Sequence, residues 1–337
     1  MTSSDVPARR RLGAIGMALT LSVAAAAAPV LAQDDDMGSG AVEGEVTLYT
    51  SVTQDTVDAV LAALEEQHPD LAVELLRAPT GELDARIATE TRTGGIAADV
   101  LWMTDPLSMQ RYDADGLLAP LEGDVFDVVP PEYRSDSFVG TRLLNLIIVV
   151  GSDVDPMPES WADLADSAFA DAVVLPDPGF AGSAFAALGF FATDEEFGLE
   201  FYEQLKANGA IQVASPVDVL NDVAEGRKAA GITLDKIVRS NAEKGSPIEL
   251  LWPEPGAIAL YSPAAAVASS DDLAAAEAFV EFLVSPEAQA AIASTGWQPV
   301  RPDVEWPHSG PVVTPDWAEL FGEQEDLLEG YRAIFGD

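Results

Sequence analysis

The stretch from Val46 to Asp105 opens with VTLYTS (46–51) and closes with DVLWMTD (99–105), and its pattern decides the fold. Between these two segments lies a third apolar segment, 71–76, in which leucine and valine alternate with other residues. Each segment has the composition of a β-strand and runs into a short polar turn. Repeated strand–turn–helix units of this kind predict an α/β fold built on a parallel sheet.

The segments that follow the strands have helical periodicity. In residues 54–67 the apolar side chains recur at i, i+3, i+4 and i+7, at Val57, Val60, Leu61 and Leu64. A second helix is expected to open at Thr80-Gly81 and to end at Gly94-Gly95, because glycine commonly terminates helices. In a parallel sheet the carboxyl ends of the strands line one crevice, where the first turns of the helices offer free N–H groups to a ligand.

The chain is expected to form two lobes. Residues 45–147 would be the first part of lobe 1, residues 148–256 would be lobe 2, and residues 257–337 would return to lobe 1 and add C-terminal helices. The β-branched run 144–150 predicts a strand that crosses between the lobes. The predicted architecture is an α/β clamshell with a mixed, mostly parallel sheet in each lobe and crossing hinge strands.

Local helix signals are also present in the second half of the chain. Ser215-Pro216 predicts a helix start, because serine is a common N-cap and proline fits the first helical position. Asp235 is expected to cap the helix that follows the strand 230–234. The apolar spacing in 273–283 predicts a further helix, and a last helix is expected from 316 to 335.

Residues 1–32 have the pattern of an export signal. Three arginines at 9–11 precede an apolar stretch, 12–28, and small residues stand before Gln33 at the expected cleavage site. A membrane anchor is the weaker alternative, because acidic rather than basic residues follow the stretch. Residues 33–44 are expected to be a disordered lead. We therefore expect a soluble protein that is secreted across the cytoplasmic membrane to the periplasm or the exterior. The chain has no cysteine, so it is not expected to be a lipoprotein.

Acidic residues dominate the chain. There are 57 Asp and Glu against 17 Lys and Arg, which gives a net charge of −40. A protein of this charge repels nucleic acid, so no nucleic-acid partner is expected. The skew suggests a halophilic protein that stays soluble in strong salt; an ordinary acidic secreted protein is the alternative. If the fold depends on screening of its self-repulsion, its melting temperature should rise with added sodium chloride.

The sequence offers little for catalysis. Its two histidines, His68 and His308, stand beside prolines, and no nucleophile elbow, phosphate loop or zinc-binding histidine motif is present. A secreted hydrolase with a pair of carboxylates, as in glycosidases, is the alternative, but no pair stands out among 57 acidic residues. We therefore predict no enzyme activity, no cofactor and no metal site.

Hydroxyl groups, glycines and two carboxylates follow the predicted strands, in positions suited to bind a ligand. In lobe 1 the candidate ligand-binding residues are Thr50, Ser51, Thr80, Gly81, Thr104 and Asp105, and in lobe 2 they are Gly182, Ser183, Thr233 and Asp235. Gly182-Ser183 is the sharpest signal, because glycine permits close approach and a helix N-terminus favours an anion. The alternative is that Ser51, Ser183 and Asp235 are only helix caps.

Several short motifs together resemble one protein family. They are Val46–Ser51, Ala98–Trp102, Pro158–Leu164, Leu175–Pro178 with Gly182-Ser183, Trp252–Gly256, and Ala276–Gln289 followed by Gly296 and Pro299. In this order they resemble the extracellular solute-binding proteins of ABC importers, in the branch that includes ferric-iron, phosphonate and sugar-phosphate binders. The resemblance implies the periplasmic-binding-protein type II fold and a monomeric receptor that closes on a small solute and delivers it to a membrane permease. A receptor that feeds a sensor is the alternative.

The resemblance also bears on the solute. Iron binders of this branch use a histidine, a glutamate and a tyrosine pair, and the matching positions here hold Thr53, Thr104, Asp235 and Lys236. These residues argue against tyrosinate coordination of ferric ion, although ferric ion stays an alternative. Hydroxyls and helix ends suit a phosphonate, a phosphate ester or another small anion, which Lys236 could assist. Asp105 and Asp235 would instead suit a polyamine, thiamine or another organic cation.

Overall fold

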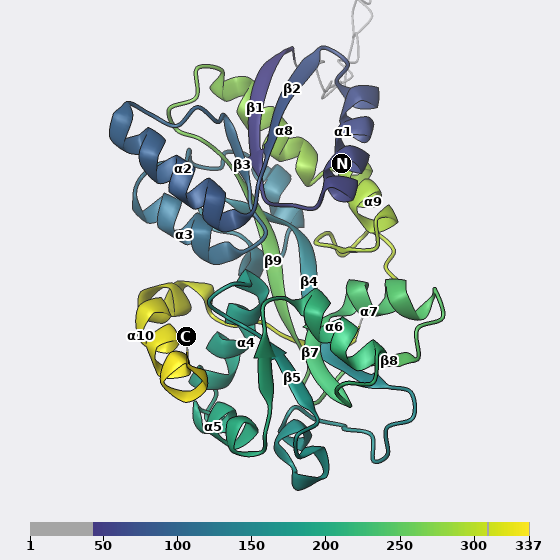
Figure 1. Ribbon diagram of the computed structural model, residues 1–337. Coiled ribbons are helices and arrows are strands. Elements are labelled where there is room, and N and C mark those ends of the chain that lie inside the picture. The colour runs from purple at the N-terminus through teal and green to yellow at the C-terminus, as the bar shows by residue number, and fades with distance from the viewer. Residues whose placement is uncertain (1–42, 309, 337) are drawn as a thin grey trace, which may run out of the picture. The chain divides into compact units, whose positions relative to one another are not determined.

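Two long antiparallel strands, β4 (Val139–Gly151) and β9 (Ala257–Ala266), run through the middle of the structure (Figure 1). The structure is a computed structural model that describes residues 43–308 and 310–336. The predicted export signal lies outside the described residues, as does the predicted lead up to residue 42. Almost every residue of β4 and β9 is buried, as expected for apolar strands covered on both faces.

Three parallel strands flank this pair on each side. The hydrogen-bonded order is β2-β1-β3-β9-β4-β7-β5-β6, and the whole sheet has 11 strands in the described part of the chain. The remaining strands are β1 (Gly44–Thr50), β2 (Leu71–Arg77), β3 (Val100–Trp102), β5 (Val173–Pro176), β6 (Ile211–Val213), β7 (Ala230–Leu234), β8 (Ile248–Leu251), β10 (Gln298–Pro299) and β11 (Val312–Val313). We call the part built on β1, β2 and β3 lobe 1, and the part built on β5, β6 and β7 lobe 2.

Ten α-helices of the described residues cover the strands. They are α1 (Gln54–Gln67), α2 (Thr80–Thr93), α3 (Pro106–Ala114), α4 (Gly182–Thr193), α5 (Glu200–Ala207), α6 (Pro216–Ala224), α7 (Asp235–Ala242), α8 (Leu273–Leu283), α9 (Pro286–Ser294) and α10 (Trp317–Phe335). None of these helices combines the length and the apolar character needed to cross a bilayer.

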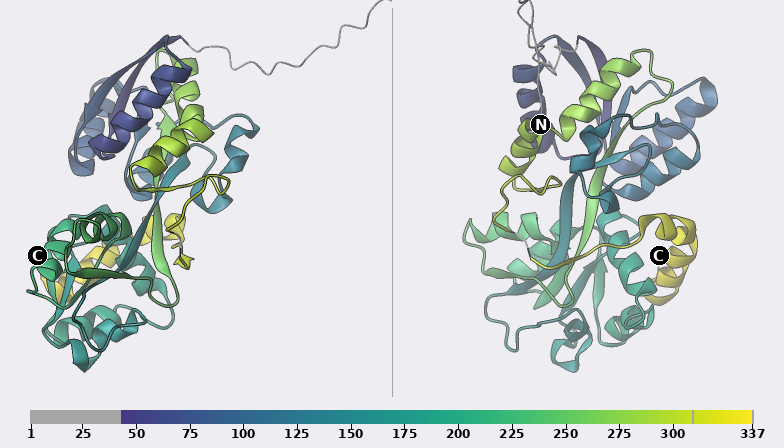
Figure 2. Two further views of the ribbon diagram at one scale, coloured as in Figure 1. Left: turned by 90° about the vertical axis from the view of Figure 1, so that its right-hand side faces the viewer. Right: turned by 180° about the vertical axis from the view of Figure 1, so that it is seen from behind.

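The predicted α/β clamshell with a mixed, mostly parallel sheet is confirmed. Strand β4 pairs with β9 from Val139 to Leu146 and with β7 from Leu146 to Val150, so it belongs to both lobes. The strands of the two lobes are thereby joined in one hydrogen-bonded sheet. Figure 2 shows β4 and β9 from the side and from behind as they pass from one lobe to the other.

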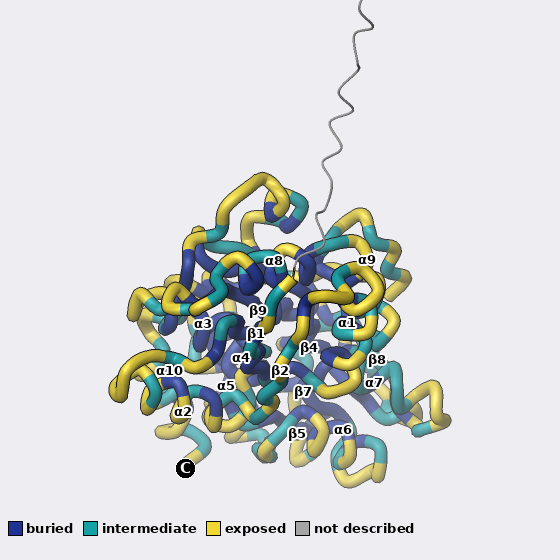
Figure 3. The backbone as a smooth tube through the Cα atoms, turned by 90° about the horizontal axis from the view of Figure 1, so that it is seen from above, coloured by how far each residue is buried: buried dark blue, intermediate teal, exposed yellow. Residues whose placement is uncertain are grey.

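The apolar core continues through both lobes. Figure 3 shows buried residues gathered around the central strands and exposed residues on the outer helices. In lobe 2 the ring of Phe191 packs against those of Trp161, Phe201 and Tyr202, with ring centroids 4.4 to 5.8 Å apart. The last helix, α10, packs on α4 and α5 of lobe 2 and on α3 of lobe 1, and its Tyr331 contacts Tyr202.

Candidate functional site

The carboxyl ends of β1 and β3 carry two hydroxyl residues that bind each other. The Ser51 hydroxyl accepts a hydrogen bond from the Thr104 backbone amide at 2.9 Å, and its oxygen lies 3.0 Å from the Thr104 hydroxyl. The Ser51 amide donates to the carbonyl of Trp102 at 3.3 Å. Both side chains are partly exposed. Lobe 1 therefore presents a fixed pair of hydroxyls where its central strands end.

Two of the predicted candidates have their hydroxyls engaged within the framework. Thr50 donates to the carbonyl of Trp102 at 2.6 Å, and Thr233 donates to the carbonyl of Pro216 at 2.7 Å. Neither residue has any exposed surface. Thr50 thus fixes the start of the turn in lobe 1, and Thr233 fixes the helix α6 against β7.

Thr80 and Gly81 form the first turn of α2, after the N-cap residue Pro79. Thr80 is half-buried and Gly81 is exposed. A Cβ atom added to Gly81 would meet no other atom within 4 Å, so this glycine faces open space.

Asp105 and Gly182 bring the two lobes into contact. Asp105 is the N-cap of α3, where its carboxylate accepts from the Ser108 amide at 3.1 Å. A Cβ atom added to Gly182 would lie 3.1 Å from the Cβ of Asp105 and 3.4 Å from its Oδ2. Burial raises the pKa of Asp105, and the negative charge of Asp84 adds to that rise, whereas the Ser108 amide opposes it. The start of α4 therefore has a carboxyl group directly opposite.

Ser183 follows this contact and is 7% exposed. Its hydroxyl has no hydrogen-bond partner in the part of the chain that the structure describes. The alternative that Ser51, Ser183 and Asp235 are simple helix caps is wrong. The N-cap positions of α1, α4 and α7 are Thr53, Ala181 and Leu234, and none of these three caps its helix with a side-chain hydrogen bond.

Asp235 therefore has another role than the predicted cap. It is the first residue of α7, and its carboxylate pairs with Arg239, one turn later, at 2.9 Å. Arg239 also donates to the carbonyl of Gly296 at 2.8 Å. Asp235 is 1% exposed, and burial raises its pKa although the Arg239 charge opposes the rise. This buried ion pair holds α7 against the turn that follows α9.

A second contact between the lobes is an ion pair. Lys236 of α7 lies 3.1 Å from the carboxylate of Asp55, in the first turn of α1. The Lys236 ammonium also lies over the ring of Trp297, 5.1 Å from its centroid.

Arg142, in β4, lies over the same ring at 4.6 Å. It is 1% exposed, and it donates to the Ser262 hydroxyl at 2.9 Å and to the Thr56 hydroxyl at 3.3 Å. Burial lowers its pKa to about 9, so it remains charged at neutral pH.

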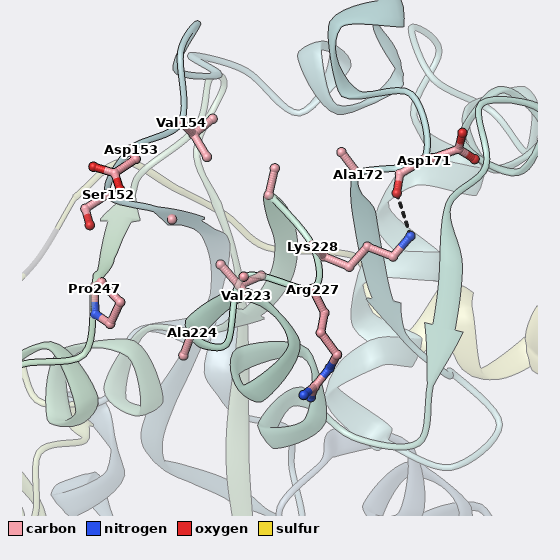
Figure 4. A pocket seen from close by; sticks show the side chains of 13 residues that line it. Ser152, Asp153, Val154, Asp171, Ala172, Val223, Ala224, Arg227, Lys228 and Pro247 are labelled. Atoms are coloured by element: carbon pink, nitrogen blue, oxygen red, sulfur yellow. Dashed lines mark hydrogen bonds between the residues drawn. The ribbon is translucent and has the colours of Figure 1, made fainter.

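A separate hollow of about 390 Å³ lies in lobe 2, close to the starts of β5 and β7 (Figure 4). Its two cations are already engaged: Lys228 donates to the Asp171 carbonyl at 2.7 Å, and Arg227 pairs with Asp222 and Glu225. The hollow lies at the opposite ends of these strands from the turn that carries Ser183. We therefore do not assign the solute to it.

The family of the chain follows from a match over most of its length. A model of the family described as bacterial extracellular solute-binding protein matches residues 46–298. The chain belongs to this family. The match spans β1 to β10, which includes both lobes and all the candidate residues.

Two curated proteins are similar in sequence to this solute-binding protein. It is 23% identical to an uncharacterized protein of Haemophilus influenzae over 75% of its own length and 76% of that protein. It is also 23% identical to a sulfate-binding protein of Synechocystis sp., over 64% of its length and 62% of the relative.

Solved structures share the fold of this solute-binding protein. Iron-bound HitA from Pseudomonas aeruginosa has a TM-score of 0.75 and 22% identity, over 86% of this chain and 99% of that one. The periplasmic binding protein AfuA from Actinobacillus pleuropneumoniae, with fructose-6-phosphate bound, has a TM-score of 0.75 and 19% identity. This match covers 87% of this chain and 99% of AfuA. The family and the fold are those of the solute-binding components of ABC importers and not of enzymes.

Sequence reasoning missed Arg142, Asp55 and Trp297 as neighbours of Lys236. Arg142 stands in an apolar strand, and its hydroxyl partners come from residues 86 and 120 positions away in the chain. One signal was available: an arginine inside a run of residues that otherwise reads as a fully buried strand.

Proposed function

We propose that this solute-binding protein captures a small organic anion, such as a phosphonate or a phosphate ester, between its lobes and delivers it to an ABC permease. The observation that carries the proposal of a solute held between the lobes is the contact of Asp105 with Gly182, which lies next to the hydroxyl pair of Ser51 and Thr104 in lobe 1 and to Ser183 in lobe 2. A solute that contacts residues of both lobes stabilises the closed form, because its affinity for that form is higher.

An organic cation such as a polyamine or thiamine is less well supported by the site. Such a ligand would need Asp105 and Asp235 as free carboxylates. Asp105 caps α3, Asp235 pairs with Arg239, and both are almost fully buried. Three cations, Arg142, Lys236 and Arg239, lie near the contacts between the two lobes, although the chain has only 17 lysines and arginines. Bound anions in relatives, such as fructose-6-phosphate in AfuA, are consistent with an anionic solute.

Direct coordination of ferric ion has less support, although HitA is an iron-bound neighbour. Among residues 43–308 and 310–336, no three His, Cys, Asp or Glu side chains are grouped so that they could hold a metal ion. We further propose that the protein acts as a monomer outside the cytoplasm, after removal of residues 1–32.

A thermal-shift panel tests the function. Phosphonates, sugar phosphates, sulfate, ferric citrate, thiamine and polyamines would be compared at high salt, because a ligand that binds only the folded state raises the melting temperature. We expect a shift with a phosphonate or a phosphate ester. A shift with ferric citrate or a polyamine alone would contradict the anion proposal.

The variant Ser183→Leu should lose this ligand shift and keep its cooperative melt, since the added side chain would occupy the space in front of the Ser183 hydroxyl. Val217→Leu, at an exposed position of α6, is the matched control and should bind normally. Equal binding by both variants would remove Ser183 from the site.

A further inference from the structure

Arg142 is a buried charge without a carboxylate partner. No Asp or Glu oxygen of the described residues lies within ion-pair distance of its guanidinium, although the chain has 57 acidic residues. Taking an ion out of water is costly unless an opposite charge compensates it. The hydroxyls of Ser262 and Thr56 accept hydrogen bonds from Arg142 but bring no negative charge.

A second cation lies against the same aromatic ring. Arg142 of the central strand and Lys236 of lobe 2 each lie over the ring of Trp297, at 4.6 and 5.1 Å from its centroid. The indole N–H of Trp297 is buried and has no hydrogen-bond partner among the described residues. Two like charges and a free donor are thus gathered where α1, α7 and the central strands meet. Such a group favours an anion that would be shared between them.

Asp55 supplies only part of the missing charge. Its carboxylate binds Lys236 at 3.1 Å, but its side chain is 53% exposed, and it does not reach Arg142 within ion-pair distance. An exposed ion pair of this kind contributes little free energy and can be exchanged for a better partner.

We propose that the anionic group of the solute binds between Arg142 and Lys236, and that it displaces the Asp55 carboxylate from Lys236. This inference rests on the proposed function and names the part of the solute that the cluster holds. The group is a phosphate, phosphonate or sulfate type of anion, which can accept hydrogen bonds from several donors at once. Arg142 is covered in this structure, so the lobes separate at the Asp55–Lys236 pair before the anion enters.

This assignment differs from an anion at the start of α4, which the sequence suggested. That helix end already faces the carboxyl group of Asp105, whose oxygen would lie 3.4 Å from a Cβ at Gly182. An anion placed there would meet an acidic group at close range, whereas one placed at Arg142 would be attracted by a positive charge.

Titration of inorganic phosphate and methylphosphonate at constant ionic strength tests the proposal. We expect Arg142→Met and Lys236→Met to weaken binding by roughly thirtyfold or more, as expected when a buried charge loses its partner. Asp55→Asn should tighten binding, because it removes the competing carboxylate. Lys228→Met, in the separate hollow of lobe 2, is the matched control and should bind like the wild type.

The melting temperature provides the second readout. Arg142→Met should melt at or above the wild-type temperature, because replacing a buried charge by an apolar side chain is commonly neutral or stabilising. If Arg142 were only structural, its loss would lower the melting temperature and leave binding by Lys236→Met and Asp55→Asn unchanged. Should Arg142→Met fail to fold, Lys236→Met and Asp55→Asn still give opposite expected results.

Three outcomes would overturn the proposal: normal affinity in both Arg142→Met and Lys236→Met, weaker binding by Asp55→Asn, or no binding of either anion by the wild type. The proposed receptor function is judged separately, by mass spectrometry of the solute released from the protein as purified from its own cells. A released neutral or cationic solute would leave the receptor function intact and refute the anion site.

Discussion

The two sides of the lobe junction differ in charge. On the α3–α4 side, the carboxyl group of Asp105 lies against Gly182, next to the hydroxyls of Ser51 and Thr104. On the α1–α7 side, the cations Arg142 and Lys236 lie on one tryptophan ring. In Figure 1 the first side is to the left of the central strands and the second is to their right.

This difference shows that a helix N-terminus does not by itself decide what binds there. Both α1 and α4 offer free backbone N–H groups, which favour an anion at either site. What separates them is the side chain that tertiary structure brings opposite each one. A carboxyl group faces α4, whereas an arginine and a lysine stand beside α1.

The largest expected effect concerns the buried ion pair between Asp235 and Arg239, which stabilises the α1–α7 side. Asp235→Ala would leave the mostly buried Arg239 without its partner, and we expect the free energy of unfolding to fall by about 3 kcal/mol. Urea denaturation measures this loss. Asp303→Ala removes the exposed partner of Arg301 and is the control, with a much smaller expected loss because solvent screens an exposed ion pair. An equal decrease in the free energy of unfolding in both variants would mean that the buried Asp235–Arg239 pair stabilises the fold no more than an exposed ion pair does.

The next effect tests the close contact on the α3–α4 side. Gly182→Val would place its side chain on Asp105, so the lobes could not approach as they do here. We expect the affinity for the solute to fall by at least about tenfold, a cost of roughly 1.4 kcal/mol. Gly322→Val, at an exposed position of α10 with open space around it, is the control and should bind normally. Isothermal titration of both variants decides whether the contact matters for closure.

Local patterns predicted many of the elements from the sequence. Helix α1 spans the predicted residues 54–67, strand β7 spans 230–234, and helix α8 spans 273–283. Ser215 caps α6 as predicted, since its side chain accepts from the amide of Asp218. These predictions succeeded because periodicity and capping depend on residues a few positions apart.

Features that depend on distant partners could not be predicted in this way. The central strand β4 begins at Val139, before the predicted start at 144, because it pairs with β9 and bulges between Gly140 and Arg142. The carboxylate of Asp235 was expected to cap α7, and it pairs with Arg239 instead. The two charge patterns at the junction likewise arise from residues more than 70 positions apart, which no local signal links.

The pH dependence of stability distinguishes the buried carboxyl of the α3–α4 side. Burial raises the pKa of Asp105, so the folded state holds a proton that the unfolded state releases near pH 4. The stability due to this group is present below that pH and is lost as the pH rises through the raised pKa. Asp105→Asn keeps a cap of similar quality but cannot ionise. The stability of this variant relative to the wild type should therefore increase as the pH rises from 4 to 7.

Asp303→Asn is the opposite control for this experiment, because the Arg301 side chain lowers the pKa of Asp303. The stability of that variant relative to the wild type should decrease as the pH rises. Melting temperatures measured from pH 3.5 to 7.5 report both trends. Parallel curves for Asp105→Asn and the wild type would show that Asp105 does not titrate as its burial implies.

The smallest expected effect is the coupling between Asp55 and Lys236 on the α1–α7 side. A double-mutant cycle with Asp55→Asn and Lys236→Met should give a coupling free energy of about 0.2–1 kcal/mol, because Asp55 is exposed. Molar sodium chloride should reduce this coupling, since salt screens exposed charges. The same salt should raise the melting temperature of the whole protein, because it also screens the mutual repulsion of 57 acidic residues. A coupling well above 1 kcal/mol would mean that Asp55 is too firmly held for a solute anion to displace, which would count against binding between Arg142 and Lys236.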